Sequence, residues 1–268
     1  MKSARGLALI LLCGLFLTAL LADVFAPSRY DEQFRDDLNV RPSRKFPLGT
    51  DDLGRDRLSR LLYGARVSLS LAPAAALVAT LLAGAIGLAA GMQGGLFERA
   101  VVLCSDLFQS LPWFFLLLTV RALLPLNVPP LASLAVTFAV LSLLGWAGPV
   151  RVVRAGVRTI RESDYALQAR ALGCSRWRLF FVHLAPNLRP VLLAQFWISV
   201  PVFILAEANL SLLGLGVAEP LPSLGSLLRE LENYSSLPER PWILAPACLL
   251  TAVMVCFHLL VPREDRIG

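Results

Sequence analysis

Long apolar runs alternate with shorter polar stretches along this chain of 268 residues. The runs are about 20 residues long or longer, which is the length that an α-helix needs to cross the hydrocarbon core of a bilayer. Charged residues and prolines separate each run from the next. The pattern predicts six membrane-spanning helices, over residues 6–26, 67–92, 101–124, 131–150, 190–213 and 242–261.

The polar stretches between these runs differ in charge, and the difference predicts the side of the membrane on which each lies. Residues 151–189 hold eight arginines and two acidic side chains, whereas residues 27–66 are of mixed charge and the last polar loop is acidic. Six spans place both chain ends on the same side as the basic stretch, together with Lys2 and Arg5. Because cytoplasmic loops are rich in lysine and arginine, we expect the N- and C-termini and residues 151–189 to be cytoplasmic.

The composition supports a location in the lipid bilayer for most of the chain. Hydrophobic residues make up 56% of it and charged residues 16%, against about a quarter charged in soluble domains. Most of the net charge of +6 lies in the basic stretch, so it indicates membrane orientation and not a nucleic-acid partner. The five cysteines fall mostly in apolar runs and are expected to act as small hydrophobic residues. We expect an all-α, polytopic membrane protein.

Two stretches near the N-terminus allow more than one interpretation. Residues 6–26 could be a signal peptide, but no convincing small-x-small cleavage site follows them, and we expect a retained helix. Residues 58–66 have apolar positions at helical spacing, which fits either a helix along the membrane interface or an ordinary solvated loop.

The second predicted helix carries small side chains along one face. Ala79, Ala83, Gly87 and Gly91 recur every four residues. Such a face lets another helix approach closely in lipid, although mere richness in alanine would give the same pattern.

Few polar groups fall inside the predicted spans. We expect Asp106 to lie at the membrane interface and Gln195, which is deeper, to make a helix–helix hydrogen bond. Glu207 and Asn209, near the outer end of the fifth span, fit either a translocation path or a bond across helices.

The sequence has no phosphate-binding loop with GK[ST], no G-x-S-x-G and no HExxH motif. We therefore expect no enzyme activity, catalytic residue, cofactor or metal site in this chain itself.

The basic stretch has the pattern of a helical hairpin. Helix-forming residues from Arg158 to Leu172 predict one short helix, and Gly173 can take the left-handed conformation that ends it. Ser175 is placed to cap a second short helix, and Pro186 ends that helix before the fifth span. A rigid hairpin between two spans can carry force from a cytoplasmic partner into the membrane.

Several sequence blocks resemble one family of transport subunits. DYALQARALG (164–173), followed after nine residues by HLAPN (183–187), is similar to the EAA coupling motif of bacterial ABC importer permeases. The other blocks, in order, are PLGTDDLGRDRLSRLLYGARVSL (47–69), Trp146 with VRVVR (150–154), and EANLSLLGLGV (207–217) with PLPSLG (220–225). Together they resemble the inner-membrane permeases of the dipeptide/oligopeptide/nickel family. Leu167 and Gln168 stand where that motif usually has glutamate and alanine, which affects the strength and partner preference of the coupling contact.

The resemblance implies the type I ABC importer permease fold and a set of partners. Residues 1–66 would supply a first helix and a periplasmic segment, and residues 67–268 the permease core, with residues 151–189 as its coupling loop. The implied partners are a second homologous permease, two ATP-binding cassette ATPase subunits and a periplasmic or extracellular substrate-binding protein. The implied ATPase contacts are Asp164, Tyr165, Ala169, Arg170, Ala171, Leu172, Gly173 and Ser175.

We therefore expect a permease subunit of an ATP-driven importer in the bacterial inner (plasma) membrane, forming half of a translocation pathway for di- and oligopeptides. Import of nickel or a metallophore by the same family is one alternative. An ion-coupled secondary transporter, from a different class, is another, and it should show internal repeats and paired broken helices. No internal repeat is evident in the sequence.

Overall fold

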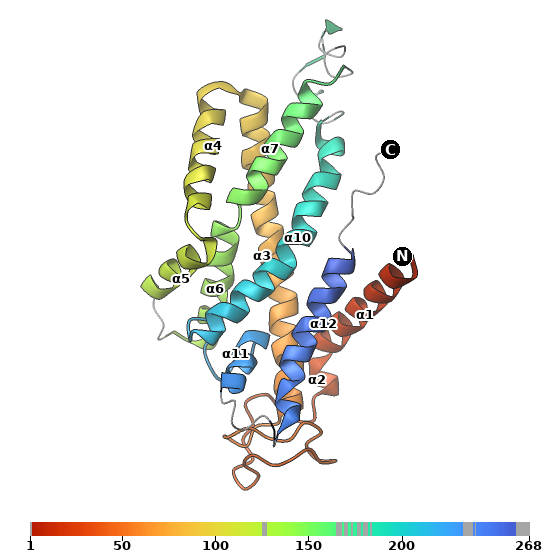
Figure 1. Cartoon of the computed structure of the whole chain (residues 1–268), viewed down its shortest axis with the longest axis vertical. Helices are drawn as coiled ribbons and strands as arrows, with labels where there is room; N and C mark the ends of the chain where they lie inside the picture. The colour runs from red at the N-terminus through yellow and green to blue at the C-terminus, as the bar shows by residue number, and fades with distance from the viewer. Residues whose placement is uncertain are drawn as a thin grey trace.

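The protein is a bundle of helices elongated along one axis (Figure 1). The computed structural model describes residues 2–124, 128–164, 168, 171–172, 174–175, 178, 182, 184–232, 238 and 240–260. A long irregular segment, residues 26–56, lies at one end of the bundle, and the connection from α7 to α10 lies at the opposite end. We call these the outer end and the coupling end.

Helices account for most of the described residues. The longer ones are joined by loops or by sharp bends, and the described part of the chain also has the 3₁₀ turns η2 and η4. In chain order they are α1 (Lys2–Leu20), α2 (Ala22–Phe25), α3 (Arg57–Gln93), α4 (Gly95–Ser110), α5 (Trp113–Leu123), α6 (Pro130–Leu144), α7 (Ala147–Arg161), α10 (Ala185–Leu212), α11 (Leu224–Leu228), η2 (Arg229–Glu232), η4 (Pro241–Leu244) and α12 (Ala245–Leu260).

Helix α3 is the central element, and it begins ten residues before the span predicted at residue 67. The Asp56 carboxylate caps it by accepting a hydrogen bond from the Ser59 backbone amide at 2.8 Å. The segment 58–66 is therefore helical and leads directly into the rest of α3, so the alternative of a solvated loop is wrong, whereas its place along the membrane interface stays a prediction. No helix-breaking residue separates it from the rest of α3 until Pro73, which the helix accommodates.

The small-residue face of α3 is buried, and its Gly87 and Gly91 pack closely against α7, which agrees with the predicted close approach of another helix. Ala79, Ala83, Gly87 and Gly91 are all buried. A Cβ placed on Gly91 would lie 2.7 Å from the Val157 side chain, and one on Gly87 would lie 2.8 Å from the Val150 carbonyl oxygen. Only the missing side chains allow this approach, so the pattern reflects packing and not mere alanine richness.

The third predicted span is broken into two helices. Helices α4 and α5 are inclined to each other by 86°, and the break lies at Leu111 and Pro112. Proline cannot continue the hydrogen-bond ladder and disfavours helical geometry in the residue before it, which accounts for the break.

The fourth predicted span is longer than expected. Helices α6 and α7 together run from Pro130 to Arg161 as one candidate span, with a local break at Gly145 and Trp146. Residues 151–161 are thus the end of α7. The prediction that a separate short helix begins at Arg158 is wrong, because Arg158 lies within α7. The Ser163 hydroxyl donates to the Ile160 carbonyl at 2.6 Å and so competes with continued helix after Arg161.

Four helices of the described chain are long and apolar enough to cross a membrane, or up to five if the bent pair α4–α5 counts as one span. They are α3, α6–α7, α10 and the η4–α12 segment. The apolar part of α1, Arg5–Leu20, is shorter than this. The all-α architecture agrees with the prediction, and the count of six spans stays a prediction.

Candidate functional site

We call residues 162–184, which join α7 to α10 at the coupling end, the coupling segment (Figure 1). Among its described residues, Asp164, Gln168 and Ala171 are helical and exposed, and Leu172 is 89% exposed. The Ser175 hydroxyl accepts a hydrogen bond from the Arg178 backbone amide at 3.3 Å, the contact predicted for a helix cap. Four of the proposed ATPase contacts lie outside the described residues: Tyr165, Ala169, Arg170 and Gly173.

Both ends of the coupling segment are fastened to one packed cluster. Val153 and Val157 on α7 contact Leu184, which precedes α10, and Leu188 in the first turns of α10. Pro186 also lies in the first turn of α10, where its missing amide hydrogen costs nothing. A displacement of the segment would therefore move α7 and α10 together.

Helix α7 is in turn held to α3 and α4. The Arg154 guanidinium donates to the Glu98 carboxylate at 2.6 Å, and Arg161 donates to the Gly91 and Met92 carbonyls at 3.0 and 3.1 Å. Carbonyls at a helix C-terminus carry partial negative charge, so an arginine there is favourable. Asp106, on the deeper half of α4, pairs with Arg151 at 2.9 Å, and both side chains are about half exposed.

Glu207 and Asn209 on α10 have different surroundings. Glu207 is fully buried and accepts hydrogen bonds from Ser211 at 2.7 Å and from Ser68 on α3 at 3.3 Å. The Ser68 hydroxyl also accepts from the Leu224 amide at 3.1 Å, at the start of α11. Glu207 thus takes part in a bond across helices, which was one of the two roles considered for it. Asn209 is exposed.

The outer end contains an ion-pair network that the sequence reasoning missed. Arg55 pairs with Asp51 at 2.7 Å and with Glu219 at 2.8 Å. Arg60, whose side chain is 2% exposed, donates to Glu219 at 3.0 Å and lies 3.8 Å from Asp51. These contacts tie the segment before α3 to the loop after α10.

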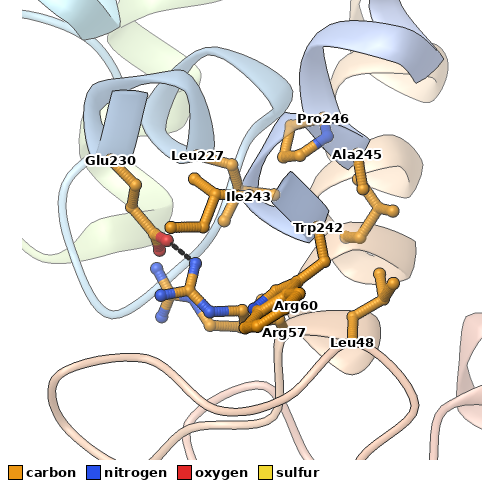
Figure 2. A pocket seen from close by; sticks show the side chains of 10 residues that line it. Leu48, Arg57, Arg60, Leu227, Glu230, Trp242, Ile243, Ala245 and Pro246 are labelled. Atoms are coloured by element: carbon orange, nitrogen blue, oxygen red, sulfur yellow. Dashed lines mark hydrogen bonds and ion pairs between the residues drawn. The ribbon is translucent and has the colours of Figure 1, made fainter. Parts of the chain in front are cut away.

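A second junction lies beside this network (Figure 2). Arg57, in the first turn of α3, pairs with Glu230 of η2, and Trp242 of η4 lies next to the two arginines Arg57 and Arg60. Arg240 donates to the Asn39 side chain at 2.6 Å, which adds the irregular segment 26–56 to the junction. The last loop is therefore fixed to the start of α3.

Two of the sequence blocks noted for their family resemblance meet at this end. The block 47–69 provides Arg55, Arg60 and Ser68, and the block 207–217 provides Glu207. Glu219 is one of the two residues between that block and the adjoining block 220–225. A Cβ on Gly64 would lie 3.1 Å from the Ser223 carbonyl carbon, which explains a glycine at that position. The sequence shows that these residues are charged, but it holds no signal that Arg60 and Glu219 meet.

Comparisons with known proteins identify the family of the chain. Residues 83–265, more than half of the chain, match the family model described as binding-protein-dependent transport system inner membrane component. The chain belongs to this family.

Three relatives illustrate the similarity within the family. The chain is 32% identical over 254 residues to the dipeptide transport system permease protein DppC of Bacillus subtilis, covering 94% of this chain and 77% of the relative. It is 32% identical over 261 residues to the oligopeptide transport system permease protein OppC of the same organism, covering 96% and 83%. It is 36% identical over 247 residues to the di/tripeptide transport system permease protein DppC of Pseudomonas aeruginosa, covering 90% and 78%.

Family membership fixes the general role of the chain. The chain is an inner-membrane, multi-pass transport component with the all-α permease fold, and it is not itself an enzyme. As a binding-protein-dependent component it works with ATPase and substrate-binding proteins. The predicted family resemblance is confirmed.

Proposed function

We propose that this chain is a permease subunit of an ATP-driven importer for di- and oligopeptides, forming half of the translocation pathway. The printed functions of the relatives, which are dipeptide, oligopeptide and di/tripeptide transport, support this substrate class over nickel or a metallophore and over ion-coupled transport. One observation supports the transmission of movement from the ATPases to the membrane helices: described residues of the coupling segment are exposed, and its two ends pack on one cluster of α7 and α10.

The assembly that follows from this role has four kinds of chain. Two ATP-binding cassette ATPases bind the coupling segments of this permease and of a second, homologous permease. A substrate-binding protein delivers the peptide at the outer end. The contacts on this chain are Asp164, Tyr165, Ala169, Arg170, Ala171, Leu172, Gly173 and Ser175. Leu172 supports the assignment, because a leucine that is 89% exposed gains most from being covered by a partner.

Orientation in the bacterial inner membrane follows from charge. The coupling end and both termini face the cytoplasm, and the segment 26–56 faces the periplasm. The eight arginines of residues 151–189 support this orientation.

We divide the chain into residues 1–66, which add the first helix and the periplasmic segment, and the permease core of residues 67–268. Helix α3 crosses that boundary and joins the two parts.

In this mechanism the ATPases bind and hydrolyse ATP, and the permease converts their conformational change into movement of its helices. Closure of the two ATPases on nucleotide displaces the coupling segments. Because Leu184 and Leu188 pack on Val153 and Val157, α7 and α10 respond as one unit and not as independent helices. The buried contact of Glu207 with Ser68 passes the movement of α10 to α3 near the outer end.

The test is a pull-down of the ATPases with the purified permease pair. Gly173→Leu is expected to abolish association and peptide uptake, because the bulky side chain sits in the proposed contact. Gly14→Leu is the control, since no atom in the described part of the chain lies within 4 Å of a Cβ added at Gly14. Undiminished association and uptake with Gly173→Leu would count against the docking assignment.

A further inference from the structure

A groove crosses the middle of the bundle where two helix breaks meet α10. The break between α4 and α5 contributes Gln109 and Trp113, and the break between α6 and α7 contributes Gly145. Helix α10 contributes Gln195, Ser199 and Phe203. Irregular backbone at membrane depth is tolerated only where it is buried in protein or lines a water-filled cavity. Two such breaks opening onto one groove favour the second case.

A stacked aromatic pair forms one side of the groove. The rings of Trp113 and Phe203 are stacked, with centroids 6.1 Å apart and planes inclined by 11°. A Cβ on Gly145 would collide with the Phe203 ring, so a glycine at the break leaves room for that ring. The wall therefore depends on three elements, α5, the α6–α7 break and α10.

The polar side chains of the groove differ in how they are satisfied. The Gln109 amide donates to the Ser105 hydroxyl at 3.0 Å, which orients it. Gln195 and Ser199, one turn apart on α10, make no side-chain hydrogen bond to any residue in the described part of the chain. The helix–helix bond expected for Gln195 is thus not made within this chain.

Their depth makes the lack of partners informative. Residues 195 and 199 lie roughly 15–20 Å along α10 from its first residue, which is near the middle of a bilayer core of about 30 Å. A polar side chain left without a hydrogen bond in hydrocarbon is costly. Gln195 and Ser199 are therefore expected to find their partners outside this chain.

We propose that Gln195 and Ser199 hydrogen-bond the main chain of a peptide that passes through this groove. The proposal rests on the peptide-import function proposed above. An amide and a hydroxyl can each donate and accept, which matches the N–H and C=O groups of a peptide backbone. None of the described residues that line the groove is charged, so the groove binds the peptide backbone and does not select peptide side chains by charge.

The position of the two residues also connects binding to coupling. Helix α10 begins directly after the coupling segment, and its first turns pack on α7. A movement of that segment is carried along α10 to Gln195 and Ser199, and so reaches the groove. The groove therefore changes its shape as the ATPases close, and its affinity for the peptide changes as a result.

The test uses photocrosslinking in the complete transporter, reconstituted in lipid with its ATPases, second permease and binding protein. A benzoylphenylalanine is placed at position 195 or 199, and a radiolabelled tripeptide is supplied during ATP turnover. Crosslinks to the peptide are expected from both positions. Position 205 is the control, because Leu205 lies on the same helix, is 43% exposed and does not line the groove. Crosslinks only to the second permease, only to lipid, or none would overturn the proposal.

Uptake by substituted complexes gives a second measurement. Gln195→Leu combined with Ser199→Ala is expected to lower peptide uptake about tenfold while ATPase association stays unchanged, and Leu205→Ala to leave both unchanged. Unchanged uptake with the double substitution would overturn the proposal. If the unsubstituted complex transports no peptide at all, the proposed function fails. If it transports peptide without a crosslink at 195 or 199, the groove assignment fails alone.

Discussion

The guanidinium of Arg60 donates a hydrogen bond of 3.0 Å to the carboxylate of Glu219, which is 159 residues away along the chain. The Arg60 side chain is 2% exposed and that of Glu219 is 53% exposed, so the pair joins a buried cation on α3 to a carboxylate at the protein surface. Two other Arg60 nitrogens have no hydrogen bond in the described part of the chain. Glu219 is thus the main partner of a buried charge.

Glu219→Gln is expected to destabilise the outer end, because it removes the charge that faces Arg60. Loss of a partner for a fully buried charge costs about 3–5 kcal/mol, but solvent screens the exposed Glu219, so we expect about 1 kcal/mol. Thermal unfolding of the purified protein in detergent measures the change. Glu232→Gln, at an exposed glutamate of η2 for which the described structure has no ion pair, is the control. Equal melting temperatures for both variants would show that the pair is not stabilising.

Gly91→Ala is expected to force α3 and α7 apart at the coupling end. The added Cβ would lie 2.7 Å from Val157 Cβ and Cγ1, and overpacking of this kind costs about 1–3 kcal/mol. Val157→Ala in the same chain should restore only part of the stability, because it removes the close Cγ1 methyl group but leaves the equally close Cβ. Gly84→Ala on the same helix is the control, since its nearest neighbour is the movable end of Leu192. A Gly91→Ala variant as stable as the unsubstituted protein would contradict the packing argument.

Leu172→Asp is expected to weaken binding of the ATPases without unfolding the permease. Leu172 is 89% exposed in this chain, so the change costs the isolated subunit little, whereas a charge in an apolar contact is unfavourable. A hot-spot residue contributes about 2 kcal/mol or more, so affinity should fall at least tenfold. Titration of ATPase against the reconstituted permease pair measures it. Leu38→Asp, at an exposed leucine of the opposite end, should leave affinity unchanged.

Local patterns in the sequence predicted local features well. The spacing of Gly87 and Gly91 predicted a face for close helix packing, and the position of Ser175 predicted a cap, because both depend on residues a few positions apart. The pairing of Arg60 with Glu219 could not be predicted, because a single sequence shows which residues are charged and not which of them meet after folding. The extension of α7 to Arg161 was missed for a related reason. Arginines on one helix face were taken for loop residues, whereas Arg154 and Arg161 bond to Glu98 and to the end of α3.

Substitutions of Glu207 and of Asn209 are expected to differ in their effect on stability, although the sequence suggested the same two roles for both residues. Glu207→Ala leaves the hydroxyls of Ser68 and Ser211 without their buried acceptor, so we expect a loss of about 1–3 kcal/mol in the free energy of unfolding. Glu207→Gln keeps a carbonyl acceptor and should lose less. Asn209→Ala, at an exposed position, should stay within about 0.5 kcal/mol. Thermal unfolding and peptide uptake are measured for all three. If Glu207→Gln abolished uptake while leaving stability unchanged, Glu207 would act on the substrate and not on the junction of α3, α10 and α11.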